Sequence, residues 1–139
     1  MVRINLIEPV ELSDQHLIAE QVEILMLMSY IQKHPKMDGT EPKEFTLNKG
    51  HMKFFRDKVL YLHKRYTSIL NEMVNRGFKI TWKFPDINEI PIELYNDYKP
   101  DQKALNIINE RINERIMKKP LWYRYRRQKA YAWIVGEKC

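Results

Sequence analysis

Hydrophobic positions recur with a helical period in three stretches of the chain. The first stretch begins after Ser13, a residue type that favours the N-cap, and continues to about Lys33, before Pro35 ends it. Its second half, Val22 to Tyr30, is apolar on almost every side. A helix of this kind is normally buried, so we predict a long, buried first helix.

A second helix is predicted within residues 51–76, ending at the Arg76-Gly77 pair, because a glycine commonly follows the last helical turn. Its apolar stripe consists of Phe55, Val59, Leu62, Tyr66, Leu70 and Met73. We expect the opposite face to be exposed to solvent, since it carries Arg56, Lys58, Lys64 and Arg65. This division is typical of a surface helix with one buried side.

A third helix is predicted from about Asp101 to Lys118, with Leu105, Ile108, Ile112 and Ile116 facing inward. Residues 77–100 are predicted to form an extended loop, because the alternating run from Phe78 to Phe84 has no partner strand and an isolated strand is unstable. The pattern therefore predicts an all-α fold, in which residues 1–139 form a compact single domain of three main helices joined by long loops.

Composition limits the cellular compartments in which the protein is expected. The 139 residues, 44% of them hydrophobic, suffice for one domain with a core. No apolar run reaches the roughly 18 residues of a membrane span, and the N-terminus lacks the order of a signal peptide. The lone cysteine, Cys139, cannot form an internal disulfide. We therefore expect a cytoplasmic protein without membrane contact, associated with a nucleoid or acting in a virus-infected cell.

Charge is distributed unevenly along the chain. The formal net charge is +6, but residues 1–31 carry one base against five acids, a net charge of −4. The last 38 residues carry ten Lys or Arg against three acids, a net charge of +7. A basic surface of this kind suits a nucleic-acid backbone, although charge alone also admits an anionic membrane.

Glu23 interrupts an apolar run, and a buried carboxylate is costly unless it is paired or neutral. Helical spacing puts His16, Glu20 and Glu23 on one stripe, which is the polar route along this helix. Pattern alone favours the simpler interpretation, in which Glu23 is the solvated edge of the helix. The alternative is a functional carboxyl group with a perturbed pKa.

The N-terminus offers a second reactive group. Ile4 and Leu6 can anchor the first residues to the core, while Arg3 supplies a cation. An α-amine titrates near pKa ~8, so a useful fraction is neutral and nucleophilic at pH 7. Periodicity alone favours an ordinary frayed terminus.

The C-terminal stretch interleaves rings with cations: Trp122, Tyr123, Arg124, Tyr125, Arg126, Arg127, Lys129, Tyr131 and Trp133. Such a mixture suits a nucleic-acid surface, where rings stack on bases and cations follow phosphates. The alternative is that the rings fill the core and the cations face water, and both interpretations can hold at once. Just upstream, Arg111 and Arg115 share one exposed face of the third helix.

The sequence contains no pattern typical of a metal or nucleotide site. The four histidines, His16, His34, His51 and His63, lack zinc spacing, and no glycine-rich phosphate loop is present. We therefore expect no metal and no cofactor. Ser13, Asp14 and His16 lie together, but adjacency in sequence is not triad geometry, and we interpret them as a helix cap.

Beyond these patterns, specific motifs carry a family resemblance. Near the N-terminus they are Arg3-Ile4-Asn5-Leu6 and Glu11-Leu12-Ser13-Asp14-Gln15-His16-Leu17-Ile18-Ala19-Glu20, followed by Glu23. Further along they are Gly50-His51, Phe54-Phe55-Arg56-Asp57-Lys58, Lys64-Arg65, Arg76-Gly77-Phe78, Asn96-Asp97-Tyr98, Pro120-Leu121-Trp122-Tyr123-Arg124-Tyr125 and Lys129-Ala130-Tyr131-Ala132. In this order they resemble the pyrimidine-dimer DNA glycosylases of the bacteriophage endonuclease V type, a family with a compact all-α fold.

The resemblance implies a specific chemistry. In the family the initiator methionine is removed, and the α-amine of the next residue, here Val2, attacks C1′ of the damaged nucleotide to form a Schiff base. The family's essential glutamate matches Glu23, which would stabilise the oxocarbenium charge and serve the proton transfers of β-elimination. The implied enzyme is a DNA N-glycosylase with abasic-site lyase activity.

The resemblance also implies a DNA surface. The family residues that hold DNA match Arg3, Gln15, His16, Arg111 and Arg115, to which we add three residues of the C-terminal cluster, Trp122, Arg124 and Lys129. The expected partner is double-stranded DNA that carries a lesion and has a base turned out of the stack. We expect the protein to act as a monomer.

The chain departs from the family at two kinds of position. The usual nucleophilic residue is threonine where this chain has Val2, and the best-known member has arginines where this chain has Val22 and Met26. Val22 and Met26 make the surroundings of Glu23 more apolar, so we expect the pKa of Glu23 to be raised. The alternatives are an abasic-site lyase or a glycosylase for a different base lesion, and a non-catalytic DNA-binding protein if Met1 is retained.

Overall fold

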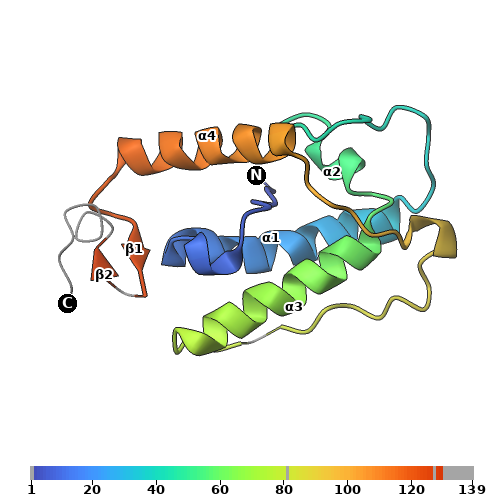
Figure 1. The fold of residues 1–139 in the computed structure, drawn as a ribbon. Helices are drawn as coiled ribbons and strands as arrows, with labels where there is room; N and C mark the ends of the chain where they lie inside the picture. The colour runs from blue at the N-terminus through green and yellow to red at the C-terminus, as the bar shows by residue number, and fades with distance from the viewer. Residues whose placement is uncertain (1, 81, 127, 130–139) are drawn as a thin grey trace.

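The computed structural model describes residues 2–80, 82–126 and 128–129. These residues form four α-helices: α1 (Asp14–Lys33), α2 (His51–Phe54), α3 (Val59–Asn75) and α4 (Gln102–Lys118). Two short 3-10 turns, η1 (Pro9–Glu11) and η2 (Ile92–Leu94), and a two-stranded antiparallel hairpin, β1 (Arg124–Tyr125) with β2 (Gln128–Lys129), complete the fold (Figure 1). The prediction of an all-α fold with three main helices is confirmed.

The first and last helices, α1 and α4, begin where side chains can cap them. Ser13 Oγ accepts a hydrogen bond from the backbone N–H of His16 at 3.1 Å, and α1 then continues to Lys33 as predicted. Asp101 Oδ1 accepts from the backbone N–H of Ala104 at 2.8 Å and caps α4. Within the described residues, no helix is both long enough and apolar enough to cross a membrane.

The helix predicted over residues 51–76 is interrupted, which corrects its predicted extent. It consists of α2 and α3, separated by residues 55–58. At the break, the backbone C=O of Asp57 accepts from Asn96 Nδ2 at 2.9 Å, and Lys58 forms an isolated bridge with Tyr95. A contact from the distant loop thus replaces helical hydrogen bonds, which local periodicity cannot reveal.

The exposed face predicted for this helix is wrong at two of its four cations. The Arg65 guanidinium is buried and meets the Glu20 carboxylate, with Nε to Oε2 at 2.6 Å. Arg56 is also buried, and its Nη2 donates to the Tyr30 hydroxyl at 2.7 Å. Both cations have partners on α1, so they can be buried without losing all their hydrogen bonds.

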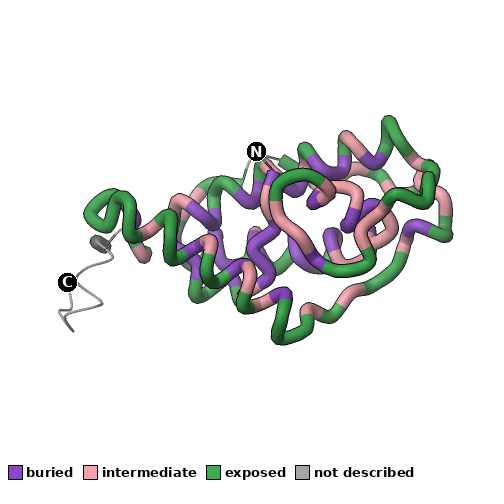
Figure 2. The backbone as a smooth tube through the Cα atoms, turned by 90° about the horizontal axis from the view of Figure 1, so that it is seen from above, coloured by how far each residue is buried: buried purple, intermediate pink, exposed green. Residues whose placement is uncertain are grey.

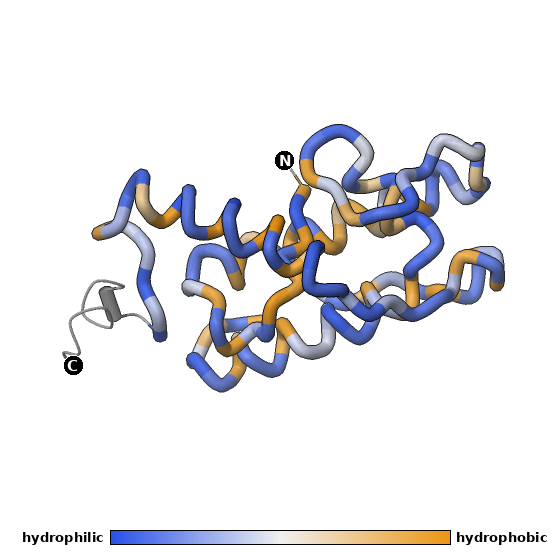
Figure 3. The backbone as a smooth tube through the Cα atoms, turned by 45° about the horizontal axis from the view of Figure 1, so that its top comes forward, coloured by the Kyte–Doolittle hydropathy of each residue, from blue (hydrophilic) through white to orange (hydrophobic). Residues whose placement is uncertain are grey.

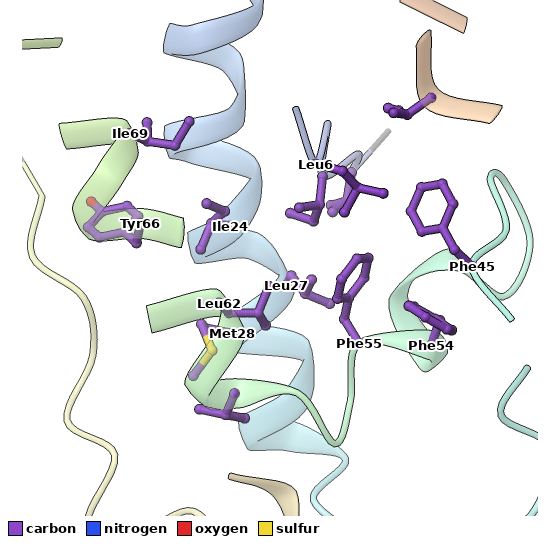
Figure 4. Close-up of a cluster of buried hydrophobic side chains, with 14 of the residues drawn as sticks. Leu6, Ile24, Leu27, Met28, Phe45, Phe54, Phe55, Leu62, Tyr66 and Ile69 are labelled. Atoms are coloured by element: carbon purple, nitrogen blue, oxygen red, sulfur yellow. The ribbon is translucent and has the colours of Figure 1, made fainter. Parts of the chain in front are cut away.

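The core lies where α1, α3 and the N-terminal segment meet. Helix α3 runs beside α1, and the N-terminal segment lies between α1 and α4 in Figure 1. Buried positions recur along these elements in Figure 2, and apolar positions gather at their junction in Figure 3. The close-up in Figure 4 shows the side chains that fill this space: Leu6, Ile24, Leu27, Met28, Phe45, Phe54, Phe55, Leu62, Tyr66 and Ile69.

The loop predicted over residues 77–100 is confirmed as largely extended, with η2 as its helical turn. Gly77 follows α3 with a φ of 83°, the left-handed conformation that ends many helices. The loop is held to α3 by the Tyr66 hydroxyl, which donates to the backbone C=O of Trp82 at 2.7 Å. The short hairpin after α4 was not predicted from the sequence.

Candidate active site

The N-terminal segment is tied to the core on two sides. The backbone N–H of Ile4 donates to His51 Nε2 at 2.9 Å, and that of Asn5 donates to Glu20 Oε1 at 3.1 Å. The chain then turns at Leu6, whose φ is 61°, and the N–H of Ile7 bonds to the C=O of Asn5 at 2.6 Å. Val2, Ile4, Asn5 and Leu6 are all buried. The frayed terminus that periodicity favours is therefore wrong for residues 2–6.

The hydrogen bonds of His51 fix its protonation. Its Nδ1 lies 2.7 Å from the backbone C=O of Thr46, which can only accept, so Nδ1 carries the proton. The Nε2 lone pair is then free to accept from Ile4. Burial lowers the pKa of His51, which keeps the ring in this neutral form at pH 7.

Glu23 is half-buried beside this segment. Loss of hydration on burial raises the pKa of its carboxyl from 4.5 to about 7, and the nearby Glu20 charge adds to the rise. Three influences oppose it: the Arg3 cation, the charge of the amino terminus and a hydrogen bond from the Arg3 backbone amide. The expected rise in pKa is confirmed in direction, and the carboxyl is half-buried rather than at a fully solvated edge.

Arg3 connects Glu23 to α4. Burial lowers the pKa of its guanidinium, the Glu23 charge raises it, and the charges of Arg115 and Arg111 lower it. Its Nε is buried without a hydrogen-bond partner among the described residues. Arg111 is also 3.6 Å from Glu114, whereas Arg115 is exposed. Arg3 therefore lies within electrostatic reach both of the Glu23 carboxyl and of the two α4 cations, Arg111 and Arg115.

His16 lies in the same region, and its ring is neutral. Its Nδ1 lies 2.7 Å from Ser13 Oγ, and its ring stacks on Tyr123 at 4.8 Å between centroids with an interplanar angle of 6°. Burial, together with the nearby Arg3 charge, lowers its pKa from 6.5 to about 4. Ser13 Oγ already accepts the His16 backbone N–H, so the hydroxyl proton can serve Nδ1. The proton of the neutral ring then sits on Nε2, which has no partner among the described residues.

The remaining candidate site residues lie near the N-terminal end of α1. The Gln15 side chain is engaged with the C-terminal segment, because its Nε2 donates to the C=O of Trp122 at 2.5 Å and its Oε1 accepts from the N–H of Arg124 at 2.9 Å. The side chains of Trp122 and Arg124 are exposed. Lys129 belongs to β2, but its side chain lies outside the described part of the chain, as do Arg127, Tyr131, Trp133 and Cys139.

The structure therefore brings together Val2, Arg3, His16, Glu23, Arg111 and Arg115. Two residues of this region were missed as site residues: His51, for which the sequence gives no local signal, and Tyr123, which was noted only as one member of the aromatic run. Tyr123 is buried against His16. In the part of the chain that is described, no three His, Cys, Asp or Glu side chains gather as a metal site would require.

A family model described as pyrimidine dimer DNA glycosylase matches residues 1–86, which is more than half of the chain. The chain belongs to this family. The match covers the N-terminal segment with α1, α2 and α3, and so includes Val2, Arg3, His16 and Glu23. As a pyrimidine dimer DNA glycosylase, the protein is a DNA-repair enzyme whose substrate is damaged DNA. Arg111 and Arg115 lie beyond the matched range.

Proposed function

We propose that this glycosylase releases the damaged base through a covalent imine on the α-amine of Val2 and then cleaves the strand at the resulting abasic site. One observation carries the proposal: the Arg3 backbone amide lies beside the half-buried Glu23 carboxyl. Backbone geometry keeps the nitrogen of residue 2 within about 4 Å of the nitrogen of residue 3. Once Met1 is removed, a free amine and a carboxyl group therefore lie close to each other.

The first step exchanges one bond at C1′ for another. The neutral Val2 amine attacks C1′, and the bond from C1′ to the base nitrogen breaks with its electron pair leaving on the base. Ionised Glu23 stabilises the positive charge that develops on the sugar. The added nitrogen then loses its proton through Glu23 to O4′, the ring opens, and C1′ becomes doubly bonded to the Val2 nitrogen.

The second step breaks the strand without an oxidant or reductant. The cationic imine acidifies C2′, and the Glu23 carboxylate accepts a proton from that carbon. The electron pair forms a double bond between C2′ and C3′, while the bond from C3′ to oxygen breaks and the phosphate leaves as an anion. Water then hydrolyses the imine and returns the Val2 amine.

A pKa of about 7 suits Glu23 to both steps. At neutral pH the ionised and protonated forms are both populated, so the same group can accept a proton and then donate it. Arg3 and the two α4 cations, Arg111 and Arg115, supply positive charge for the phosphates on either side of the reacting sugar. Turning a base out of the stack costs a few kcal/mol, which such backbone contacts offset.

The test begins with the intact mass of the purified protein, which must lack Met1. Borohydride trapping is then performed on duplexes that carry an abasic site or a pyrimidine dimer, and the adduct is mapped to the Val2 nitrogen. The control is the same protein with a short N-terminal extension, which should bind DNA but give no adduct. Adducts on both duplexes support the proposal. An adduct on abasic DNA alone would assign lyase action or another lesion, and no adduct would leave a DNA-binding protein without this chemistry.

A further inference from the structure

One face of α1 is apolar and open. Ile18, Val22 and Met26 are 39%, 45% and 50% exposed, and their spacing of four residues puts them in one row along the helix. The sequence predicts that this apolar helix is buried on every side, yet no described element covers this row. Exposed apolar surface of this extent on a helix calls for a functional explanation.

The C-terminal segment lies near the start of this row. Gln15, about one turn before Ile18, holds the backbone C=O of Trp122 at 2.5 Å, and the Trp122 side chain is 54% exposed. We use the name apolar strip for Trp122, Ile18, Val22 and Met26. The strip therefore joins two elements that lie far apart in the sequence.

The strip borders the candidate active site. Val22 directly precedes Glu23 in the chain, and Met26 lies three residues after it, a spacing at which helical side chains are neighbours about 5–6 Å apart at Cβ. A sugar that reaches the Glu23 carboxyl therefore lies next to this edge of α1. Ala19 and Ser29, which are also exposed on this side of α1, are uncharged, and the exposed Lys33 lies one turn beyond Ser29 at the end of the helix. The cations of the site lie instead on the N-terminal segment and α4.

We propose that the apolar strip is a specificity surface that contacts unstacked nucleobases next to the lesion. A phosphate lying on Ile18, Val22 and Met26 would lose water and find no cation among these three side chains, whereas the faces of bases can be buried there favourably. Apolar side chains that insert between base steps act in this way in proteins that kink DNA. Continuity with the candidate active site around Glu23 favours lesion-bearing DNA over a second copy of the chain, which would obstruct that site. The proposal rests on the function proposed above.

The strip is tested by binding, separately from the chemistry. In an E23Q background, dissociation constants are measured for dimer-containing and undamaged duplexes over a range of salt, with and without the pair V22S and M26Q. The preference for the damaged duplex should fall roughly five- to twentyfold, as expected for lost apolar contacts. Affinity for undamaged DNA and the slope of its logarithm against the logarithm of salt should stay constant. M117Q, which changes a methionine that is 76% exposed on α4, is the matched control and should alter neither quantity.

Three results would overturn the proposal: equal losses of affinity on both duplexes, a smaller salt slope in the double variant, or a change of sedimentation that assigns the strip to a second copy. A 2-aminopurine base next to the lesion provides an independent signal, since its fluorescence should rise on binding less strongly in the double variant. Borohydride trapping with the protein that keeps Glu23 reports the chemistry alone. Failed trapping with an intact preference for damaged DNA would refute the imine mechanism and leave the strip, and the reverse result would refute the strip.

Discussion

The carboxyl groups on the two sides of α1 have different surroundings. On the α3 side, the Glu20 carboxylate is fully buried and receives Arg65 Nε at 2.6 Å, Arg65 Nη2 at 3.0 Å and Asn5 Nδ2 at 2.8 Å. On the α4 side, Glu23 has a pKa raised to about 7, and no Lys or Arg side chain of the described residues reaches it within ion-pair distance. The Glu20 carboxyl has its bonding capacity filled, whereas Glu23, three residues away, is engaged only by the Arg3 backbone amide.

This contrast separates a structural network from a reactive one. A buried ion with all its partners is held in one geometry and one protonation state, so it contributes to a unique fold. Arg3 and His16, on the same side as Glu23, each hold a buried nitrogen without a partner among the described residues. Such groups cost stability in the free protein, and they are available to a bound substrate. The α3 side is thus expected to determine stability, and the α4 side activity.

The largest expected effect is on catalysis. The substitution E23Q should lower single-turnover cleavage by about 10²- to 10⁴-fold, because it removes the group that transfers protons. Its effect on stability should have the opposite sign. Since the folded-state pKa of about 7 exceeds the ordinary 4.5, the native state loses stability as pH rises from 4.5 to 7. E23Q should therefore melt higher than the parent above pH 7 and equally below pH 4.5. A large drop in melting temperature would contradict this assignment.

The substitution E20Q should act on the fold instead. It leaves the buried Arg65 cation without its carboxylate, a loss of about 3–5 kcal/mol for a broken buried pair. Urea denaturation at an unchanged m-value measures the loss. The control is E44Q, which ends an exposed pair with Lys103 whose side chains are 70% and 67% exposed, and it should change stability by less than about 1 kcal/mol. Equal effects of the two substitutions would argue against the structural network.

His51 holds the N-terminal segment that carries Val2. We expect H51F to keep the ring packing against Phe45 and Phe55 while leaving the Ile4 N–H unpaired, a cost of about 1–3 kcal/mol. The rate of imine trapping should fall roughly tenfold with unchanged DNA affinity, as expected for a misplaced nucleophile. H51Q, whose amide oxygen can accept from Ile4, should recover most of the rate. If H51F and H51Q were equally slow, a purely structural role would explain the loss.

The smallest expected effect is a displacement of the pH profile. At saturating DNA the cleavage rate should rise with pH through about 7, because the proposed mechanism needs ionised Glu23. Removing the Arg3 cation takes away an influence that lowers this pKa, so R3Q should move the acidic limb to higher pH. Rates at saturating DNA separate this effect from weaker binding. A limb that stays in place would mean that another group controls it.

Much of this organisation could be predicted from local sequence. The cap at Ser13, the start of the last helix near Asp101 and the glycine after α3 depend on neighbouring residues only, and each was predicted correctly. The interruption at residues 55–58 depends on Asn96, which lies 39 positions from Asp57, and no window of sequence contains both. The burial of Arg65 likewise depends on Glu20, 45 positions away.

The candidate site divides in the same way. Glu23 was conspicuous because a carboxyl group stood in an apolar run, and the resemblance drew attention to Val2, Arg3 and His16. The role of His51 could not be found, since its partner is the backbone N–H of Ile4, 47 positions away, and a backbone amide leaves no mark in a sequence. The exposure of the apolar strip was also missed, because an apolar helix surface has the same pattern whether protein or solvent covers it.

The turn at Leu6 has a consequence for the substrate. With its φ of 61°, it ends a straight segment whose backbone is fastened at Ile4 and Asn5, only two and three residues from Val2. The free part of this segment, from Val2 to Ile4, spans less than about 10 Å, so it cannot move far toward a buried sugar. The mobility has to come from the nucleic acid, so the turnover of a given lesion should follow the stiffness of its flanking base steps. Flexible TA and CA steps would then be repaired faster than rigid A-tracts.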